Sequence, residues 1–253
     1  MIMKLLKCAL LASLINLAAA GCAMAVPSML NNVPTTDIVD DGNFLLMLNY
    51  FGYDYNEPQD LPTSSPVYSL QYGFKKCELG FDYVSKSDFV DNGLYPGKMA
   101  WNFKWRILTE GSDPVSLAVG AFYLGTKSYN NQYYGSSPYF VFSKQIKDAR
   151  LHLGYQTNLL GAREVDDDNK KSRGVIVGLD GVIYDHPKNP VTLYLDYTGG
   201  PLATYGFGLY QPINPSWSWT YSFFKPAMKT LPVSGGELPD QHWFGVCYTI
   251  PTK

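Results

Sequence analysis

The sequence contains few charged residues and, beyond its first 25 residues, no long apolar run. Charged residues make up 17% of the 253 positions, whereas a typical soluble domain has about 25%. Hydrophobic residues nevertheless reach 46% and aromatic residues 15%. A membrane-spanning helix needs about 20 consecutive apolar residues, and the body of the chain offers no such stretch. The composition therefore fits neither an ordinary soluble domain nor a helical membrane protein.

A strong charge of one sign and a cysteine framework are absent as well. The formal net charge of −2 gives no general attraction to nucleic acid or anionic lipid. After residue 25 only Cys77 and Cys247 remain, on predicted strands far apart in strand order, so we expect two small buried thiols. The glycines of Gly174–Gly181 are followed by neither a helix nor a lysine, so they form no phosphate loop. The sequence therefore predicts no nucleic-acid partner and no cofactor.

The first residues have the composition of an export signal. Lys4 and Lys7 give a basic start, and Leu5–Ala20 form an apolar core that is too short for a permanent span. Ala23-Met24-Ala25 offers a small-x-small cleavage site, so residues 1–25 are interpreted as a signal peptide. An alternative interpretation uses Ala19–Cys22, which resembles a lipoprotein cleavage box without its usual leucine and would leave Cys22 lipidated.

From residue 42 onward the chain divides into about twelve short segments of alternating residues, typical of strands. We expect these strands at Asn43–Phe51, Pro66–Phe74, Cys77–Val84, Lys98–Leu108, Val115–Leu124, Tyr139–Gln145, Arg150–Leu159, Gly174–Tyr184, Val191–Thr198, Leu202–Tyr210, Ser216–Phe224 and Gln241–Ile250. Short connections rich in turn residues alternate with long ones, and the short link Gly199-Gly200-Pro201 is the exception. With an even number of strands, both termini and all tight turns fall at one end.

The two faces of the predicted strands differ in chemistry. Trp217, Trp219, Tyr221 and Phe223, for example, alternate with serines and a threonine. A period of two with aromatic residues on one face fits a barrel that has lipid outside and water inside. A soluble β-sandwich also alternates, but it does not explain the aromatic-rich faces or the alternating loop lengths.

The last predicted strand resembles the assembly signal of bacterial outer-membrane barrels. Gly245–Ile250 fits the pattern Gly-x-x-apolar-x-apolar, although the final aromatic residue is missing and the chain continues through Pro251-Thr252-Lys253. This resemblance to the porin-like outer-membrane β-barrel superfamily implies an all-β fold, an antiparallel up-and-down transmembrane β-barrel of about twelve strands over residues 42–253. It also implies an integral protein of a Gram-negative-type outer membrane, with periplasmic termini, surrounded by membrane lipid and inserted by the barrel assembly machinery.

Two predicted strands alternate poorly. Phe44–Leu48 and Tyr139–Phe142 are apolar on both faces, so we expect an apolar partner inside the barrel at these strands. Residues 26–41 are a candidate plug or a periplasmic lead-in.

The alternation assigns a set of charged residues to the lumen, where charged side chains set the selectivity of a pore. The predicted pore-lining residues are Glu78, Asp82, Lys104, Arg106, Arg150, His152, Asp180 and Asp196. Counting from the tight turns places Arg106 near Glu78 and Lys104 near Asp82, and it places Lys144 inside as well. Small residues are predicted to line the opposite wall, namely Gly174, Gly178, Thr204, Gly206, Gly208, Ser216, Ser218, Thr220 and Ser222. The same charges also fit a lumen sealed by ion pairs.

No catalytic motif is found, so the protein is not predicted to be an enzyme. Outer-membrane phospholipases place a Ser two residues after a His, but Gly154 follows His152 at that spacing and Phe244 follows His242. Asp166–Asn169 lack the Gly and distal Glu of a calcium loop, so no metal is predicted. The sequence thus indicates a narrow passive channel for small polar solutes or ions. The alternative is a closed structural or adhesive barrel that acts through extracellular loops such as Lys127–Ser137.

Overall fold

The computed structural model describes residues 29–30, 33–54, 64–85, 99–124, 137–157, 173–199, 203–227 and 240–252. The predicted signal peptide, Cys22, Asp166–Asn169 and nearly all of the loop Lys127–Ser137 lie outside these ranges. Within the described residues, no helix is long and apolar enough to cross a membrane.

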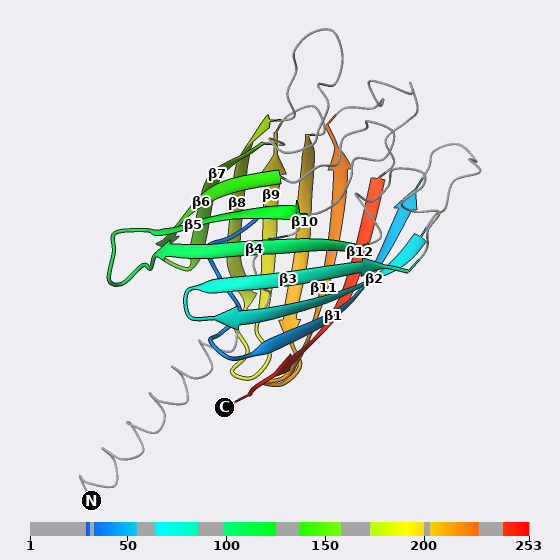
Figure 1. Cartoon of the computed structure of the whole chain (residues 1–253), viewed down its shortest axis with the longest axis horizontal. Helices are drawn as coiled ribbons and strands as arrows, with labels where there is room; N and C mark the ends of the chain where they lie inside the picture. Colours follow the sequence, from blue (N-terminus) through cyan, green and yellow to red (C-terminus); the bar gives the residue numbers. More distant parts are fainter. Residues whose placement is uncertain are drawn as a thin grey trace, which may run out of the picture.

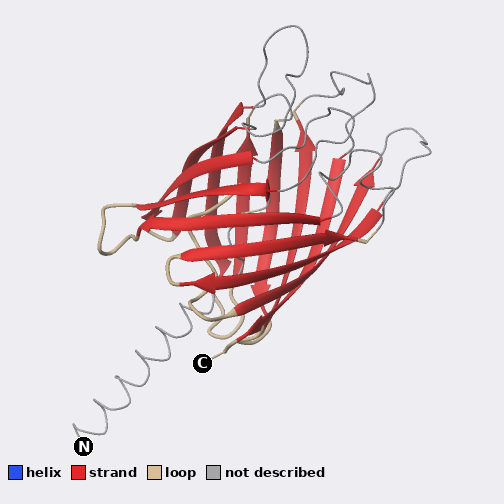
Figure 2. Cartoon of the chain, in the orientation of Figure 1, coloured by secondary structure: helices blue, strands red, loops and turns tan. Residues whose placement is uncertain are grey.

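Among the described residues, twelve strands follow one another (Figures 1 and 2). They are β1 (Phe44–Asp54), β2 (Ser64–Phe74), β3 (Cys77–Val84), β4 (Met99–Leu108), β5 (Ser116–Leu124), β6 (Ser137–Ile146), β7 (Ala149–Thr157), β8 (Arg173–Tyr184), β9 (Val191–Thr198), β10 (Thr204–Pro212), β11 (Trp217–Pro226) and β12 (Asp240–Ile250). Every predicted strand is present, and the observed ends lie within three residues of the predicted ones. The predicted all-β fold class is confirmed.

The strands form a single closed antiparallel barrel. Each strand pairs with its neighbours in sequence, and β1 pairs with β12 from Phe44 opposite Ile250 to Asp54 opposite Asp240. Closure leaves no unpaired sheet edge, which is the condition for strands to cross a hydrocarbon layer. A β-sandwich of two sheets is thereby ruled out.

The outer wall is apolar and rich in aromatic side chains. In β11 the burial alternates along the strand, with Trp217 exposed and Ser218, Thr220 and Ser222 buried. The exposed large residues include Tyr50, Tyr68, Trp101, Trp105, Phe140, Tyr205, Trp217 and Phe244. Such a continuous apolar exterior is the surface that lipid covers in membrane barrels.

Tight turns connect the strand pairs at the end where the C-terminal Ile250 lies. In the turns between β2 and β3 and between β6 and β7, Lys75 and Lys147 adopt positive φ angles of 53° and 56°. Gly111, between β4 and β5, has a φ of 104° that suits a residue without Cβ. All these turns join consecutive antiparallel strands, as the predicted up-and-down topology requires.

The segment before β1 lies inside the barrel. Leu30 and Val33 are buried against a cluster of side chains from β5 to β10, which includes Tyr139 and Val141. Further along, Val39 packs against Leu45 of β1 and Cys247 of β12. The segment thus supplies the apolar partner that the poorly alternating strands β1 and β6 require.

Close approach to Gly73 of β2 fixes the end of this segment. A Cβ atom built on Gly73 would lie 2.2 Å from the carbonyl oxygens of Val39 and Asp40. Gly42 also donates a backbone hydrogen bond to the Gly73 carbonyl at 2.9 Å. Only glycine leaves room for the segment at this point of the wall.

The Gly73→Ala substitution is therefore expected to destabilise the barrel. The methyl group forces the backbone of the segment away from β2, and overpacking of this kind costs about 1–3 kcal/mol. The free energy of unfolding, measured by urea titration in lipid vesicles, checks this expectation. Gly181→Ala is the control, because a Cβ at this position would come no closer than 3.3 Å to any neighbouring atom. Equal stability of the two variants would contradict the docking of the segment on β2.

Candidate functional site in the lumen

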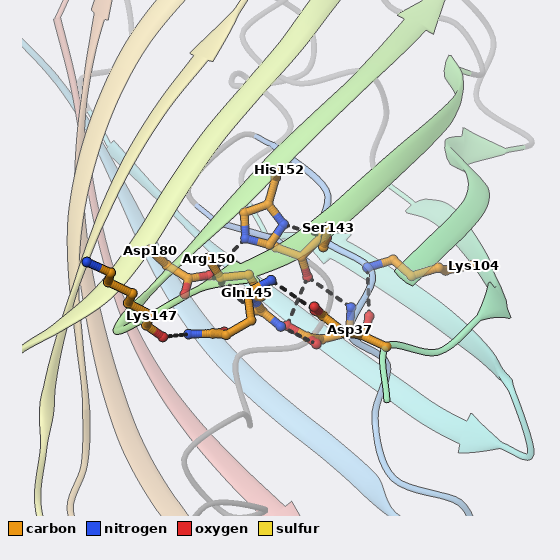
Figure 3. A network of polar contacts seen from close by, with 10 residues as sticks. Asp37, Lys104, Ser143, Gln145, Lys147, Arg150, His152 and Asp180 are labelled. Carbon is orange, nitrogen blue, oxygen red and sulfur yellow. Dashed lines mark hydrogen bonds and ion pairs between the residues drawn. The ribbon is translucent and has the colours of Figure 1, made fainter. Parts of the chain in front are cut away.

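Asp37 and Arg150 form a two-pronged ion pair inside the barrel (Figure 3). Nη1 and Nη2 of Arg150 donate to Oδ1 and Oδ2 of Asp37 at 2.7 and 2.5 Å. Arg150 lies on β7, whereas Asp37 belongs to the segment before β1. Both side chains are largely buried, with 10% and 18% of their surface exposed. The pair therefore attaches the N-terminal segment to the inner wall.

A second carboxylate holds Arg150 from the side of the wall. Oδ2 of Asp180 on β8 accepts from Nε and Nη2 of Arg150 at 3.2 and 3.0 Å. The same oxygen lies 2.8 Å from Nε2 of His152, and Nδ1 of His152 lies 2.7 Å from the Ser143 hydroxyl. An ionised carboxylate can only accept a hydrogen bond, so Nε2 of His152 donates to Asp180. When the ring is neutral, Nδ1 accepts from the Ser143 hydroxyl. Three neighbouring strands thus hold the guanidinium in place.

The set Ser143, His152 and Asp180 has the composition of a nucleophilic triad. However, Ser143 and His152 expose 1% and 0% of their surface, so a substrate has no access to the hydroxyl. Asp180 is also shared with Arg150. In this structure the set orients the arginine.

The opposite side of the segment contacts β3 and β4. Nζ of Lys104 donates to the backbone carbonyl of Asp37 at 2.9 Å, and the backbone amide of Val39 donates to Oε2 of Glu78 at 2.9 Å. Figure 3 shows Asp37 lying between Arg150 on one side and Lys104 on the other. Charged side chains of two separate parts of the wall therefore bind one segment.

The remaining predicted pore-lining residues lie outside this network. Asp82 accepts from Nδ2 of Asn102 at 2.7 Å. Asp196 is buried, with Oδ1 lying 2.0 Å from the position of a Cβ built on Gly206. Arg106 is half-buried on β4, and its Nε has no hydrogen-bond partner.

The predicted cross-strand pairs were wrong by two or more residues. Glu78 lies opposite Lys104, Asp82 lies opposite Ala100, and the backbone of Arg106 donates to the Lys76 carbonyl beyond the end of β3. The reason is that strands of a barrel tilt, so their tight turns are staggered rather than level. Counting from the turns therefore gave the wrong register.

The inward placement of Lys144 was also wrong. Tyr139, Val141 and Ser143 are the buried face of β6, so Lys144 points outward. It contacts Glu110 in the turn between β4 and β5 at 2.8 Å. Its hydrogen bond holds the pKa of the half-buried Glu110 carboxyl below its usual range.

Small side chains cover another part of the inner wall. Ser218, Thr220 and Ser222 of β11 are buried, as is Gly208 of β10. These strands are neighbours in the barrel and lie apart from β3 and β4. The inner wall therefore consists of charged arcs and a small-residue arc.

Asp37 and Ser143 were not identified from the sequence. Asp37 lies in an irregular segment without periodicity, and its only signal is an acidic residue inside a candidate plug. Ser143 follows a run that is apolar on both faces, so the sequence did not show whether its side chain points into or out of the barrel.

The charge on Asp37 is stabilised by its surroundings. Burial raises the pKa of its carboxyl, but the charge and hydrogen bonds of Arg150 act in the opposite direction, as do Lys104 and His152 more weakly. The net result is a pKa below the usual value of 3.8. The ion pair is therefore intact at neutral pH.

Comparisons with known proteins identify the fold. No family profile matches the sequence, and no curated protein matches it. An outer-membrane channel from Pseudomonas putida F1 has a similar structure, with a TM-score of 0.53, 10% identity, and coverage of 88% of this chain and 99% of that chain. The KdgM porin aligns with a TM-score of 0.49 and 9% identity, over 81% of this chain and 98% of that one. The first likeness shows that the closed twelve-stranded barrel of the described residues has the same fold as a solved outer-membrane channel.

Acid is expected to release the N-terminal segment. The pKa of Asp37 is lower in the folded protein than in the unfolded chain, so its stabilisation is complete above the usual value of 3.8 and is lost as the pH falls through the lowered value. A fluorophore on Asp40→Cys, an exposed position, reports this release as a fall in anisotropy below pH 3.8.

The Asp37→Asn variant separates this effect from the other acidic groups nearby, Glu78 and Asp180. Because the variant lacks the titrating carboxyl, it is expected to show low anisotropy at all pH values. Identical pH curves for the two proteins would show that Asp37 does not hold the segment.

Proposed function

We propose that this protein is an integral outer-membrane barrel that acts as a narrow passive channel for small polar solutes or ions. The observation that carries the proposal is the closed barrel with an apolar exterior and an inner wall of buried charges. A polar inner wall is costly to build unless it serves water or solutes, since an apolar core stabilises a small barrel better. Charges of both signs on that wall give a basis for selecting solutes.

In this proposal the tight turns and both termini face the periplasm. Export through a signal peptide at residues 1–25 brings the chain to that compartment, and the barrel assembly machinery inserts it among membrane lipids. Residues 26–41 form a plug that enters from the periplasmic end.

The solute path runs between the charged arcs and the small-residue arc of β10 and β11. Its proposed lining residues are Glu78, Asp82, Lys104, Arg106, Arg150, His152, Asp180 and Asp196. Of these, Lys104, Arg150 and Glu78 also bind the N-terminal segment or lie at its contact points. Solute passage and the position of the segment are therefore coupled.

A closed structural or adhesive barrel is the second candidate. Lys104 and His152 expose only 1% and 0% of their surface, and Leu30 and Val33 are buried inside the barrel against side chains of β5 to β10. If the N-terminal segment never leaves the lumen, the barrel stays closed and acts through its extracellular loops.

Ion selectivity in planar bilayers distinguishes the two candidates. We expect stepwise currents from the refolded chain, and we expect Lys104→Ala to lower the preference for anions because it removes a positive charge from the wall. Lys188→Ala is the matched control, since it removes the same charge from an exposed turn. Insertion without current in the wild type and in variants with a released segment would favour the closed barrel.

A further inference from the structure

We propose that Arg150, held by Asp180, is a binding site for the carboxylate group of a solute, and that Asp37 occupies this site until such a solute displaces it. This inference rests on the proposed channel function and adds to it the solute class and the means of opening. It is carried by the geometry of the Asp37–Arg150 pair and by the charges around it.

The guanidinium has the geometry of a built carboxylate site. Its two terminal nitrogens meet the two oxygens of Asp37 in parallel, at 2.7 and 2.5 Å. This fork matches a planar carboxylate and distinguishes it from a spherical anion. A point charge such as a lysine gives no such discrimination.

The site belongs to the wall and not to the segment. Ser143, His152 and Asp180 form a chain of hydrogen bonds across β6, β7 and β8 that ends at Nε and Nη2 of Arg150. Because none of these bonds involves the N-terminal segment, the arginine stays oriented when the segment leaves. Supporting side chains on rigid strands are what a preorganised site requires.

Asp37 is in turn weakly tied to its own segment. Beyond Arg150, its carboxylate contacts the Thr35 hydroxyl at 3.3 Å. Asp40 and Asp41, the other acidic residues of the segment, are exposed. Asp41 accepts from the Lys75 amide in the turn between β2 and β3, whereas Asp37 presents its carboxylate to Arg150 inside the lumen, as a solute would.

The charge balance favours an anion once Asp37 has left. Arg150 pairs with both Asp37 and Asp180, and Nζ of Lys104 donates to the Asp37 carbonyl from the other side. Departure of Asp37 therefore removes one negative charge from between two cationic side chains of the wall. A monovalent carboxylate restores the balance and remakes both hydrogen bonds to Arg150.

The first test measures displacement without requiring any current. The full chain carries a fluorophore on Asp40→Cys and is titrated at neutral pH with sodium acetate, sodium chloride or acetamide. We expect acetate to lower the anisotropy, whereas acetamide, which has the same shape without the charge, and chloride, which lacks the planar fork, leave it unchanged. An equal response to acetate and chloride would overturn the proposal.

Variants of Arg150 locate the site. Arg150→Gln and Arg150→Lys are both expected to lose the difference between acetate and chloride, although the lysine keeps the charge. Heat-dependent mobility on gels establishes that each variant is folded before titration. An acetate response that persists in folded Arg150→Gln protein would also overturn the proposal.

The second test measures current. Asp37→Asn is expected to raise the open probability in planar bilayers by roughly tenfold, the factor expected from loss of a charge-assisted hydrogen bond. Asp40→Asn makes the same change at an exposed position of the segment and is expected to behave as the wild type. Unchanged currents in Asp37→Asn would show that Asp37 does not keep the lumen closed.

A disulfide between the segment and the wall tests whether displacement is needed. A Cβ on Gly178 would lie 3.4 Å from Cγ1 of Val33, so Val33→Cys with Gly178→Cys is suited to a bridge after a small shift of Leu30. We expect the oxidised protein to be silent and the reduced protein to conduct, with Val33→Cys alone as the control. Equal currents in both states would contradict displacement.

The outcomes separate this inference from the proposed function. If all inserted variants are silent, the channel function fails, while the acetate titration still decides whether Arg150 binds a carboxylate. If currents occur but acetate and chloride act alike, the channel stands and the carboxylate site does not.

Discussion

Closure of β1 onto β12 is the constraint on which the rest of this structure depends. A strand within lipid must have every backbone amide and carbonyl paired, so the sheet must close. Closure turns the alternation of each strand into an inside and an outside. The aromatic residues that would be a liability in water then face lipid, and the polar residues of the same strands are collected in the lumen.

The collected charges create a second requirement, because a buried charge is costly unless it has a partner. Within the wall, Asp180 pairs with Arg150 and Asn102 donates to Asp82. The N-terminal segment adds further partners, with the Asp37 carboxylate on Arg150, the Asp37 carbonyl on Lys104 and the Val39 amide on Glu78. The segment and the charged wall are thus complementary in chemistry as well as in shape.

The strands and their faces were predictable because period-two alternation and turn residues are local properties of the sequence. The register was not, since the stagger of β3 against β4 depends on the tilt of the whole barrel. The need for an apolar partner at β1 and β6 was visible in their poor alternation, and Leu30, Val33 and Val39 supply it. The role of Asp37 was not visible, because its partner Arg150 lies more than 100 residues away and joins it only through the closed fold.

The attachment of the segment combines two kinds of interaction with different sensitivities. The packing of Leu30 and Val33 does not depend on the ions present, and burial of each such side chain contributes about 1.5–3 kcal/mol. The Asp37–Arg150 pair, in contrast, competes with any carboxylate that enters the lumen. Because the segment is covalently continuous with β1, Asp37 is present at an effective concentration in the millimolar range. A competing solute must therefore either reach comparable concentrations or bring further contacts with the wall, so a channel closed in this way would respond to abundant carboxylates and ignore traces of them.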